Sequence, residues 1–180
     1  MERTRSAILA AAASVLARDR TATLPQIAAA AGVGRTTVHR YYADRDTLIK
    51  AAVEDSAQVI GEAIGEARLD EGPPVEALHR LVTAYLSVGD RLVFLFNDPH
   101  VMQQYGVDQP EQPPSADPVM DLIERGQREG VFDDQSTAWW IQHVLWALVY
   151  TGIDEVSKGN LSRHGVAATV IRTLERGILA

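Results

Sequence analysis

Residues 23–42, which read TLPQIAAAAGVGRTTVHRYY, have the spacing of two short helices joined by a tight turn. Ala28 offers a small side chain where two helices would cross closely, and Gly32 tolerates the positive φ that a tight turn requires. Val33 and Val38 supply apolar anchors through which the second helix would pack on the first. The segment is therefore predicted to form a helix-turn-helix.

Residues at the predicted helix ends support this interpretation. Thr23 and Gln26 have the spacing of a capping box, and Pro25 falls in the first helical turn, where its missing N–H removes no hydrogen bond. Asp44 is placed to cap the following helix, and Asp46 lies near the positive end of that helix. Helices are therefore predicted to begin at about residues 23 and 45.

The second helix of the pair carries hydrogen-bond donors and aromatic residues on the face predicted to point away from the core. Side chains of these types bind the phosphate backbone and the base edges of DNA. The alternative is a plain helical hairpin whose polar residues are only solvated. The candidate DNA-binding residues are Thr23, Pro25, Arg35, Thr36, Thr37, His39, Arg40, Tyr41, Tyr42 and Arg45.

Charge is divided unevenly along the chain. The net charge of the 180 residues is −7, which is unusual for a protein that binds nucleic acid. Residues 1–50 have a net charge of +4, from eight Lys and Arg against four Asp and Glu, whereas residues 51–180 have a net charge of −11. The basic N-terminal part would be attracted to DNA, and the acidic remainder would be repelled by it.

The composition argues against several other classes of protein. The absence of cysteine excludes a disulfide framework, a thiolate metal site and a cysteine nucleophile. The five histidines form no pair at ligand spacing, and no glycine-rich phosphate-binding loop is present. We therefore expect no catalytic site, no metal and no other cofactor. No signal peptide and no membrane-spanning stretch are recognisable, so a cytoplasmic protein is expected.

The pattern of apolar residues predicts an all-α fold of about nine helices without strands. Gly72, Pro73 and Pro74 interrupt the pattern, and a kink is expected at Gly89 and Asp90 within the helix that follows. Residues 106–116, which are rich in proline, are expected to form a loop. The predicted helices span about residues 4–18, 23–31, 35–42, 45–67, 75–96, 98–105, 117–129, 136–157 and 162–178.

The eighth predicted helix is apolar on nearly all sides. Such a helix must be covered on nearly all sides, so we expect its own domain on one face and a second subunit on the other. An aliphatic stripe of this helix and a matching stripe of the ninth helix would form the interface of a twofold homodimer. The first stripe is Ile141, Leu145, Leu148 and Gly152, and the second is Val166, Val170, Ile171, Leu174 and Ile178.

A separate aromatic stripe on the eighth helix is the candidate wall of a small-molecule pocket, which is usually apolar with a few polar groups. The alternative, which the sequence leaves open, is that these side chains, with the histidine among them, are core residues. His100 and Tyr105, beside the proline-rich loop, are candidates for the mouth of the pocket. The candidate ligand-binding residues are Tyr85, His100, Tyr105, Trp139, His143, Trp146 and Tyr150.

From residue 8 to about residue 53 the chain resembles the DNA-binding domain of the TetR family of transcriptional regulators. The resemblance rests on the residues at 8–12, 27–28, 31–33, 37–42 and 45–48. It implies an N-terminal three-helix DNA-binding domain over residues 1–47. It also implies a C-terminal helical domain over residues 48–180 that binds a ligand and forms the dimer.

By position, the resemblance also implies roles for individual residues. Arg35 and Thr36 fall where the family reads base edges, and Arg45 falls near a phosphate. Thr37, His39, Tyr41 and Tyr42 fall where the family contacts phosphates and the groove wall. The chain departs from the usual pattern at Gly34, His39 and Tyr42, where the family usually has serine, tyrosine and phenylalanine.

Together these features predict a sequence-specific, DNA-binding transcriptional regulator. A twofold dimer would present its recognition helices to successive major grooves, about 34–36 Å apart, and would select a palindromic operator. The leading hypothesis is a repressor that an unidentified small-molecule effector releases from the operator. The alternatives are a helical protein-interaction module without DNA binding and, from another class, an enzyme.

Overall fold

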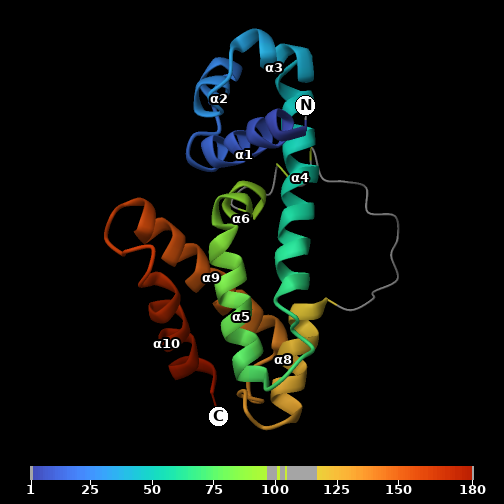
Figure 1. Cartoon of the computed structure of the whole chain (residues 1–180). Helices are drawn as coiled ribbons and strands as arrows, with labels where there is room; N and C mark the ends of the chain where they lie inside the picture. The colour runs from blue at the N-terminus through green and yellow to red at the C-terminus, as the bar shows by residue number, and fades with distance from the viewer. Residues whose placement is uncertain (1, 97–100, 102–103, 105–116, 180) are drawn as a thin grey trace. The chain divides into compact units, whose positions relative to one another are not determined.

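The computed structural model describes residues 2–96, 101, 104 and 117–179. This part of the chain is all-α, as predicted, with nine helices, no strand and one isolated antiparallel bridge between Phe132 and Leu179. The helices, labelled in Figure 1, are α1 (Glu2–Arg18), α2 (Leu24–Ala30), α3 (Arg35–Tyr41), α4 (Arg45–Glu66), α5 (Pro74–Ser87), α6 (Gly89–Phe96), α8 (Pro118–Arg128), α9 (Ala138–Ser157) and α10 (Val166–Ile178). Within the same residues, no helix is both long and apolar enough to cross a bilayer. The helix predicted over residues 98–105 and the loop predicted over residues 106–116 lie almost entirely outside the described residues.

By its internal contacts the chain divides into two compact units. The first unit consists of Met1–Gly61 and Asp90–Pro110, and the second consists of Glu62–Gly89 and Glu111–Ala180. The first unit is therefore larger than the predicted domain of residues 1–47. It includes most of α4, and it includes α6, which is remote in the sequence.

The first unit is built on the buried face of α1. Apolar side chains recur along this helix at the spacing that places them on one face, which contacts α2. Ile27 of α2, Val38 of α3 and Leu48 of α4 are fully buried within the same unit. The buried residues of α1 itself are Ile8, Leu9, Ala12, Ala13 and Leu16. This packing fixes the inner face of α3 and leaves its other face to solvent.

The second unit has one hydrophobic core, to which α5, α8, α9 and α10 all contribute. Two glycines in this core allow neighbouring side chains to pack directly against the helix backbone. A Cβ on Gly152 of α9 would lie 2.8 Å from Val166 Cγ2, and a Cβ on Gly126 of α8 would lie 2.1 Å from Phe132 Cδ2. Because the interior is close-packed, a larger residue at either position would force its neighbours apart.

The helix predicted over residues 75–96 is divided in the structure. α5 ends at Ser87 and α6 begins at Gly89, where the sequence predicts a kink. The intervening Val88 leaves the helical conformation, with φ −110° and ψ 22°, while its N–H still donates to the Tyr85 carbonyl at 3.3 Å. A Cβ on Gly89 would lie 2.9 Å from Ile153 Cγ1 of α9. The expected kink is therefore a break held by close packing.

The aliphatic stripe of α9 packs inside its own unit. Ile141, Leu145 and Gly152 are buried in the core, and Leu148 is half-buried. The matching residues of α10 are likewise buried or half-buried against the core of the same unit: Val166, Val170, Ile171, Leu174 and Ile178. The prediction that this face meets a second subunit is wrong. A helix that is apolar all round does not reveal from its sequence which face the chain itself covers.

Candidate nucleic-acid interface

The turn between α2 and α3 has the geometry that the sequence predicts. Ala28 is 3 % exposed and Val38 is fully buried, so the two helices meet at these side chains. Gly32 has a φ of +66°, a conformation that other residues adopt only with strain. The Val33 N–H donates to the Ala28 carbonyl at 3.0 Å, which closes the turn. The predicted helix-turn-helix is confirmed.

Local side-chain contacts fix the starts of α2 and α4. The N–H and the hydroxyl of Thr23 both donate to Gln26 Oε1, at 2.7 and 2.8 Å. Pro25 lies exposed in the first turn of α2. At the start of α4, Asp44 Oδ1 accepts from the Thr47 N–H at 2.8 Å, and this hydrogen bond lowers the pKa of the exposed Asp44 carboxyl. The first residues of both helices are thus set by contacts between residues three positions apart in the sequence.

The outer face of α3 is cationic and rich in hydrogen-bond donors. The guanidinium carbon of Arg40 lies 5.5 Å from the centre of the Tyr41 ring, a cation–π contact that orients both side chains. The face has no acidic residue, so it suits the phosphates and base edges of DNA. Its exposed residues are Arg35, Thr36, His39 and Arg40, and its half-buried ones are Thr37 and Tyr41.

Tyr42 does not belong to this face. Its side chain is 4 % exposed and its hydroxyl oxygen is inaccessible to solvent. Burial raises the pKa of the phenol, and Arg5 opposes this effect. The prediction that Tyr42 contacts a phosphate is wrong, because α3 ends at Tyr41 and the extended backbone of Tyr42 turns its ring into the core.

Arg45 holds the loop between α1 and α2 on the first turn of α4. Its Nε donates to the Ala22 carbonyl at 3.3 Å and its Nη2 donates to the Arg20 carbonyl at 2.5 Å. The half-buried guanidinium therefore has a structural role within the first unit. A phosphate contact would use its remaining N–H groups, and that contact stays a prediction.

The aromatic stripe of α9 does not face the core at its N-terminal end. Trp139 is 62 % exposed and His143 is exposed. His143 Nδ1 donates to the Trp139 carbonyl at 2.6 Å, so one of its two ring nitrogens is used within its own helix. Trp146 and Tyr150 are half-buried, with ring centres 6.4 Å apart. In the single chain Trp139 and His143 do not line an internal pocket, because the core side of α9 is the aliphatic one.

Tyr85 is a predicted effector residue whose phenol is largely buried and lies within the electrostatic influence of Asp117. Burial, and secondarily the charge of Asp117, raise the pKa of Tyr85 to about 12. Asp117 Oδ1 accepts from the Val119 N–H at 2.9 Å and caps α8, while its Oδ2 accepts from Gln142 Nε2 at 3.0 Å. Asp117 before Pro118 is a recognisable cap in the sequence, but its link to Gln142 depends on packing. His100 and Tyr105 lie outside the described residues.

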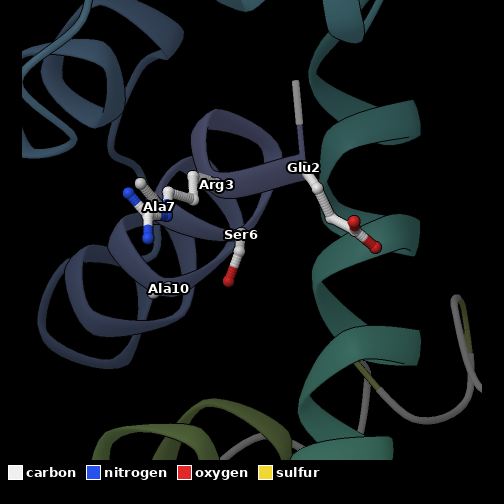
Figure 2. Close-up of a pocket in the computed structure, with 5 residues that line it drawn as sticks. All are labelled: Glu2, Arg3, Ser6, Ala7 and Ala10. Atoms are coloured by element: carbon white, nitrogen blue, oxygen red, sulfur yellow. The ribbon is translucent and has the colours of Figure 1, made fainter.

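A shallow depression on α1 is lined by Glu2, Arg3, Ser6, Ala7 and Ala10. Figure 2 shows these residues along one side of the helix, with the Glu2 carboxylate directed toward α4. All five belong to α1, so this depression differs from the pocket predicted in the C-terminal part of the chain. Nowhere in the described ranges do three His, Cys, Asp or Glu residues gather as they would around a metal ion.

Comparison with known proteins identifies the family. Residues 8–52 match the family model described as bacterial regulatory proteins, tetR family. Over 182 residues the chain is 35 % identical to the HTH-type transcriptional repressor LfrR of Mycolicibacterium smegmatis, which covers 99 % of this chain and 92 % of LfrR. The chain belongs to the TetR family. The HTH-type transcriptional regulator NfxB of Pseudomonas aeruginosa is 32 % identical over 174 residues, which covers 91 % of this chain and 87 % of NfxB.

Solved structures extend the likeness over the whole TetR fold. The crystal structure of LfrR from Mycobacterium smegmatis gives a TM-score of 0.79 at 32 % identity and covers 99 % of this chain and 98 % of that one. The structure of LfrR in complex with proflavine gives a TM-score of 0.71 at 33 % identity, with the same coverage. The matched family model describes regulatory proteins and the 35 % identical relative is an HTH-type transcriptional repressor, so the helix-turn-helix of this chain is a DNA-binding motif.

In this TetR protein, α6 is joined to α4 by contacts that no sequence pattern indicates. Nη1 of Arg91 on α6 contacts Oδ2 of Asp55 on α4, and it donates to Ser56 Oγ at 3.2 Å. The Arg91 and Asp55 side chains are only 13 % and 25 % exposed, and Ser56 is fully buried. These partners lie more than 30 residues apart, so local spacing could not reveal them.

Proposed function

We propose that this TetR regulator is a dimeric repressor that binds a palindromic operator and is released from it by a small-molecule effector. The observation that carries the proposal is the cationic outer face of α3, which the packing of α1 and α2 leaves exposed. The names of LfrR as a repressor and of NfxB as a regulator support it. The first unit would bind DNA in the cytoplasm, and the second unit would bind the effector and form the dimer.

On the operator, α3 would enter the major groove with its N-terminal residues toward the bases. Arg35 would read a base edge together with Thr36, because the exposed guanidinium can donate two hydrogen bonds to guanine. Phosphates would be contacted by the remaining exposed or half-buried donors of the motif. These are Thr23 and Arg45 beside α2 and α4, and Thr37, His39, Arg40 and Tyr41 of α3, with Pro25 against the groove wall.

The outward face of α9 would form the dimer interface, together with α10. Trp139 and Trp140 are 62 % and 63 % exposed, and Ala147 and Thr151 on the same side of the helix are also exposed. Large aromatic groups that remain exposed on a single chain commonly mark an interaction surface. A second copy would cover this face through a twofold axis, which matches the symmetry of a palindromic operator.

The effector would bind in the second unit near Tyr85, where Asp117 and Gln142 supply polar groups beside an apolar core. The Asp117 charge would favour a cationic ligand over an anionic one. The proflavine complex of LfrR supports a planar aromatic molecule as the first probe. Operator release by proflavine, measured as a fall in the fluorescence anisotropy of labelled DNA, would support this assignment, and a loss of that response in Gln142→Leu would localise it.

The test of DNA recognition is a double charge reversal, Arg35→Glu with Arg40→Glu. DNA from the neighbourhood of the gene is footprinted with purified protein at physiological salt, and binding is quantified against unrelated DNA. We expect the variant to lose at least a hundredfold in operator affinity while its circular dichroism and oligomeric state are unchanged. Arg128→Glu with Arg163→Glu changes the net charge equally at exposed positions outside the motif and should retain most of the affinity.

Two outcomes would contradict the proposal. Binding of the wild-type protein without sequence preference would exclude an operator. An equal loss of affinity in both double variants would show that general charge, and not the face of α3, attracts the DNA.

A further inference from the structure

The first turn of α6, labelled in Figure 1, carries two ion pairs of different character. Asp90 lies 3.8 Å from the Arg18 guanidinium of α1, and these side chains are 46 % and 65 % exposed. Arg91 contacts Asp55 of α4, and both of these side chains are largely buried. An exposed ion pair contributes little, whereas a buried carboxylate that loses its cation is left uncompensated. Of the two arginines, Arg91 is therefore the one on which a buried charge depends.

The hydroxyl of Tyr42 is a buried polar group without a partner. The side chain is 4 % exposed, and within the described part of the chain the hydroxyl makes no hydrogen bond of ordinary geometry. Buried hydroxyl groups are normally paired, because an unpaired one has lost its hydrogen bonds to water without replacement. A free acceptor that came within reach would therefore capture this group.

Two charges of opposite sign act on the Tyr42 phenol. Burial is the main reason that the pKa of Tyr42 is raised, while Arg5 of α1 lowers it and the charge of Asp55 raises it further. A carboxylate that raises the pKa of a phenol favours its protonated form, which donates hydrogen bonds. Asp55 is thus an acceptor near enough for its charge to act on Tyr42, and its Oδ2 is engaged by Arg91.

Tyr42 connects this buried group to the recognition helix. α3 ends at Tyr41, and the Tyr42 N–H donates to the Val38 carbonyl at 2.9 Å. A displacement of the Tyr42 ring would therefore turn the last residues of α3. These residues include Arg40 and Tyr41, which lie in contact on the DNA-binding face.

We propose that Arg91 is a positioning residue for the recognition helix: by engaging Asp55, it keeps that carboxylate from accepting a hydrogen bond from the Tyr42 hydroxyl. Without the Arg91 cation, Asp55 captures the hydroxyl, and the end of α3 moves with the ring. The inference rests on the proposed function, because operator binding is its main readout. Arg91 itself touches no DNA and acts through Asp55 and Tyr42.

Replacement of the cation tests this role. Arg91→Met should weaken binding to labelled operator at least fivefold, measured by fluorescence anisotropy at physiological salt. The matched control is Arg18→Met, which removes the same charge from the exposed ion pair of α6 and should bind within about twofold of the wild type. Arg91→Lys retains a cation beside Asp55 and should keep most of the affinity.

A second change, Tyr42→Phe, separates positioning from a general loss of stability. In the wild type the hydroxyl is unpaired, so its removal should leave the operator affinity and the melting temperature nearly unchanged. In the Arg91→Met background it should restore the affinity to within about twofold of the wild type, because the displacing hydrogen bond can no longer form. The melting temperature should instead fall by roughly 3 °C or more, since a hydrogen bond to a charged group is lost.

Equal operator affinity in Arg91→Met and Arg18→Met would overturn the proposal, because another cation, such as Arg5, would then compensate Asp55. A double variant that binds no better than Arg91→Met would also overturn it, since Arg91 would then serve the fold alone. If Arg91→Met does not fold, Arg91→Gln, which keeps side-chain donors without the charge, takes its place in both comparisons.

Failure of the wild type to bind any operator would instead overturn the proposed function. The melting temperatures would still decide the inference, because Tyr42→Phe should lower the melting temperature only where Arg91 has been replaced.

Discussion

Neighbouring side chains at the end of α3 have different roles. Tyr41 is half-buried, and its ring lies beneath the Arg40 guanidinium at the surface of the motif. Tyr42 is buried in the core of the first unit. Arg45 is polar and close to the predicted DNA surface, yet it holds two carbonyls of the α1–α2 loop. Some hydrogen-bond donors in this motif therefore stabilise the fold, and others remain at the surface that is predicted to bind DNA.

The burial of Tyr42 leads to a prediction about operator binding. Tyr42→Phe removes a hydroxyl that does not reach solvent, so operator affinity should change by less than about twofold. Tyr41→Phe removes a hydroxyl from the surface of the motif and should weaken binding to all sequences several-fold, because phosphate contacts carry no base preference. Fluorescence anisotropy with the operator and with a mutated operator measures both. A larger loss in Tyr42→Phe than in Tyr41→Phe would show that these roles are reversed.

Tyr85 should make the protein less stable in alkaline solution. Its pKa is raised to about 12 by burial, whereas in the unfolded chain it is about 10. Below pH 10 the phenol is neutral in both states and adds no pH dependence. Between pH 10 and pH 12 only the unfolded chain releases the proton, so the free energy of unfolding falls as the pH rises. Tyr85→Phe should remove about 1–3 kcal/mol of this fall, measured by urea unfolding at pH 9 and pH 11.5. An identical pH dependence in wild type and variant would contradict the assignment.

At the scale of helices, two helical glycines differ in the space available for a side chain. Gly126 of α8 has the Phe132 ring where its Cβ would lie, whereas Gly177 of α10 has open space there. Phe132 is 1 % exposed and belongs to the core, so it has no room to move away. The packing around each glycine, and not its helix propensity alone, decides what a substitution does.

Gly126→Ala should therefore destabilise the protein although alanine is the better helix former. Overlap with Phe132 is expected to lower the free energy of unfolding by about 1–3 kcal/mol. Gly177→Ala, the matched change at an open position, should raise it by about 0.5–1 kcal/mol. Chemical unfolding monitored by circular dichroism separates the two signs. A stabilising Gly126→Ala would mean that Phe132 can leave its position freely.

The cap of α4 should respond to acid. The hydrogen bond from the Thr47 N–H lowers the pKa of Asp44, so this carboxylate stabilises the folded state above its unfolded pKa of about 3.9. The contribution is lost as the pH falls through the lowered pKa of the folded state. Asp44→Asn retains a capping oxygen but has no charge to titrate. Its melting temperature should fall less steeply than that of the wild type between pH 5 and pH 3, and equal slopes would contradict this role.

Elements that depend on adjacent residues could be predicted from the sequence. The α2–α3 turn follows from Gly32, and the start of α4 follows from Asp44. The break between α5 and α6 falls at the predicted kink, although its close contact with Ile153 depends on packing. The sequence could not predict which face of α9 is buried, because apolar residues surround that helix. It also could not predict the inward turn of Tyr42, because the position of the last helical residue decides it.

At the scale of the whole molecule, the exposed side of α9 is a surface that a second subunit would cover. Trp139 and Trp140 remain largely exposed, while the aliphatic side of the helix is already covered by its own unit. The proposed dimer would cover these rings.

A charge placed at the centre of this face should separate the subunits without unfolding them. Ala147 is exposed in the single chain, so Ala147→Arg leaves the core intact, and sedimentation should show a monomer with a normal melting curve. Operator affinity should fall at least tenfold, since one recognition helix would have to bind alone. Ala57→Arg, also at an exposed alanine but on α4, is the control that should remain dimeric. A dimeric Ala147→Arg would exclude this face as the interface.

The contact of Arg91 with Asp55 and Ser56 also limits how the protein can be divided. A fragment cut after residue 61 would lack α6 and leave the buried Ser56 and the largely buried Asp55 without their cation. Grafting the operator specificity of one relative onto another should therefore require exchanging α6 along with the N-terminal segment. The first unit consists of two segments that are separated in the sequence. A fusion designed from residues 1–47 alone would therefore omit α6.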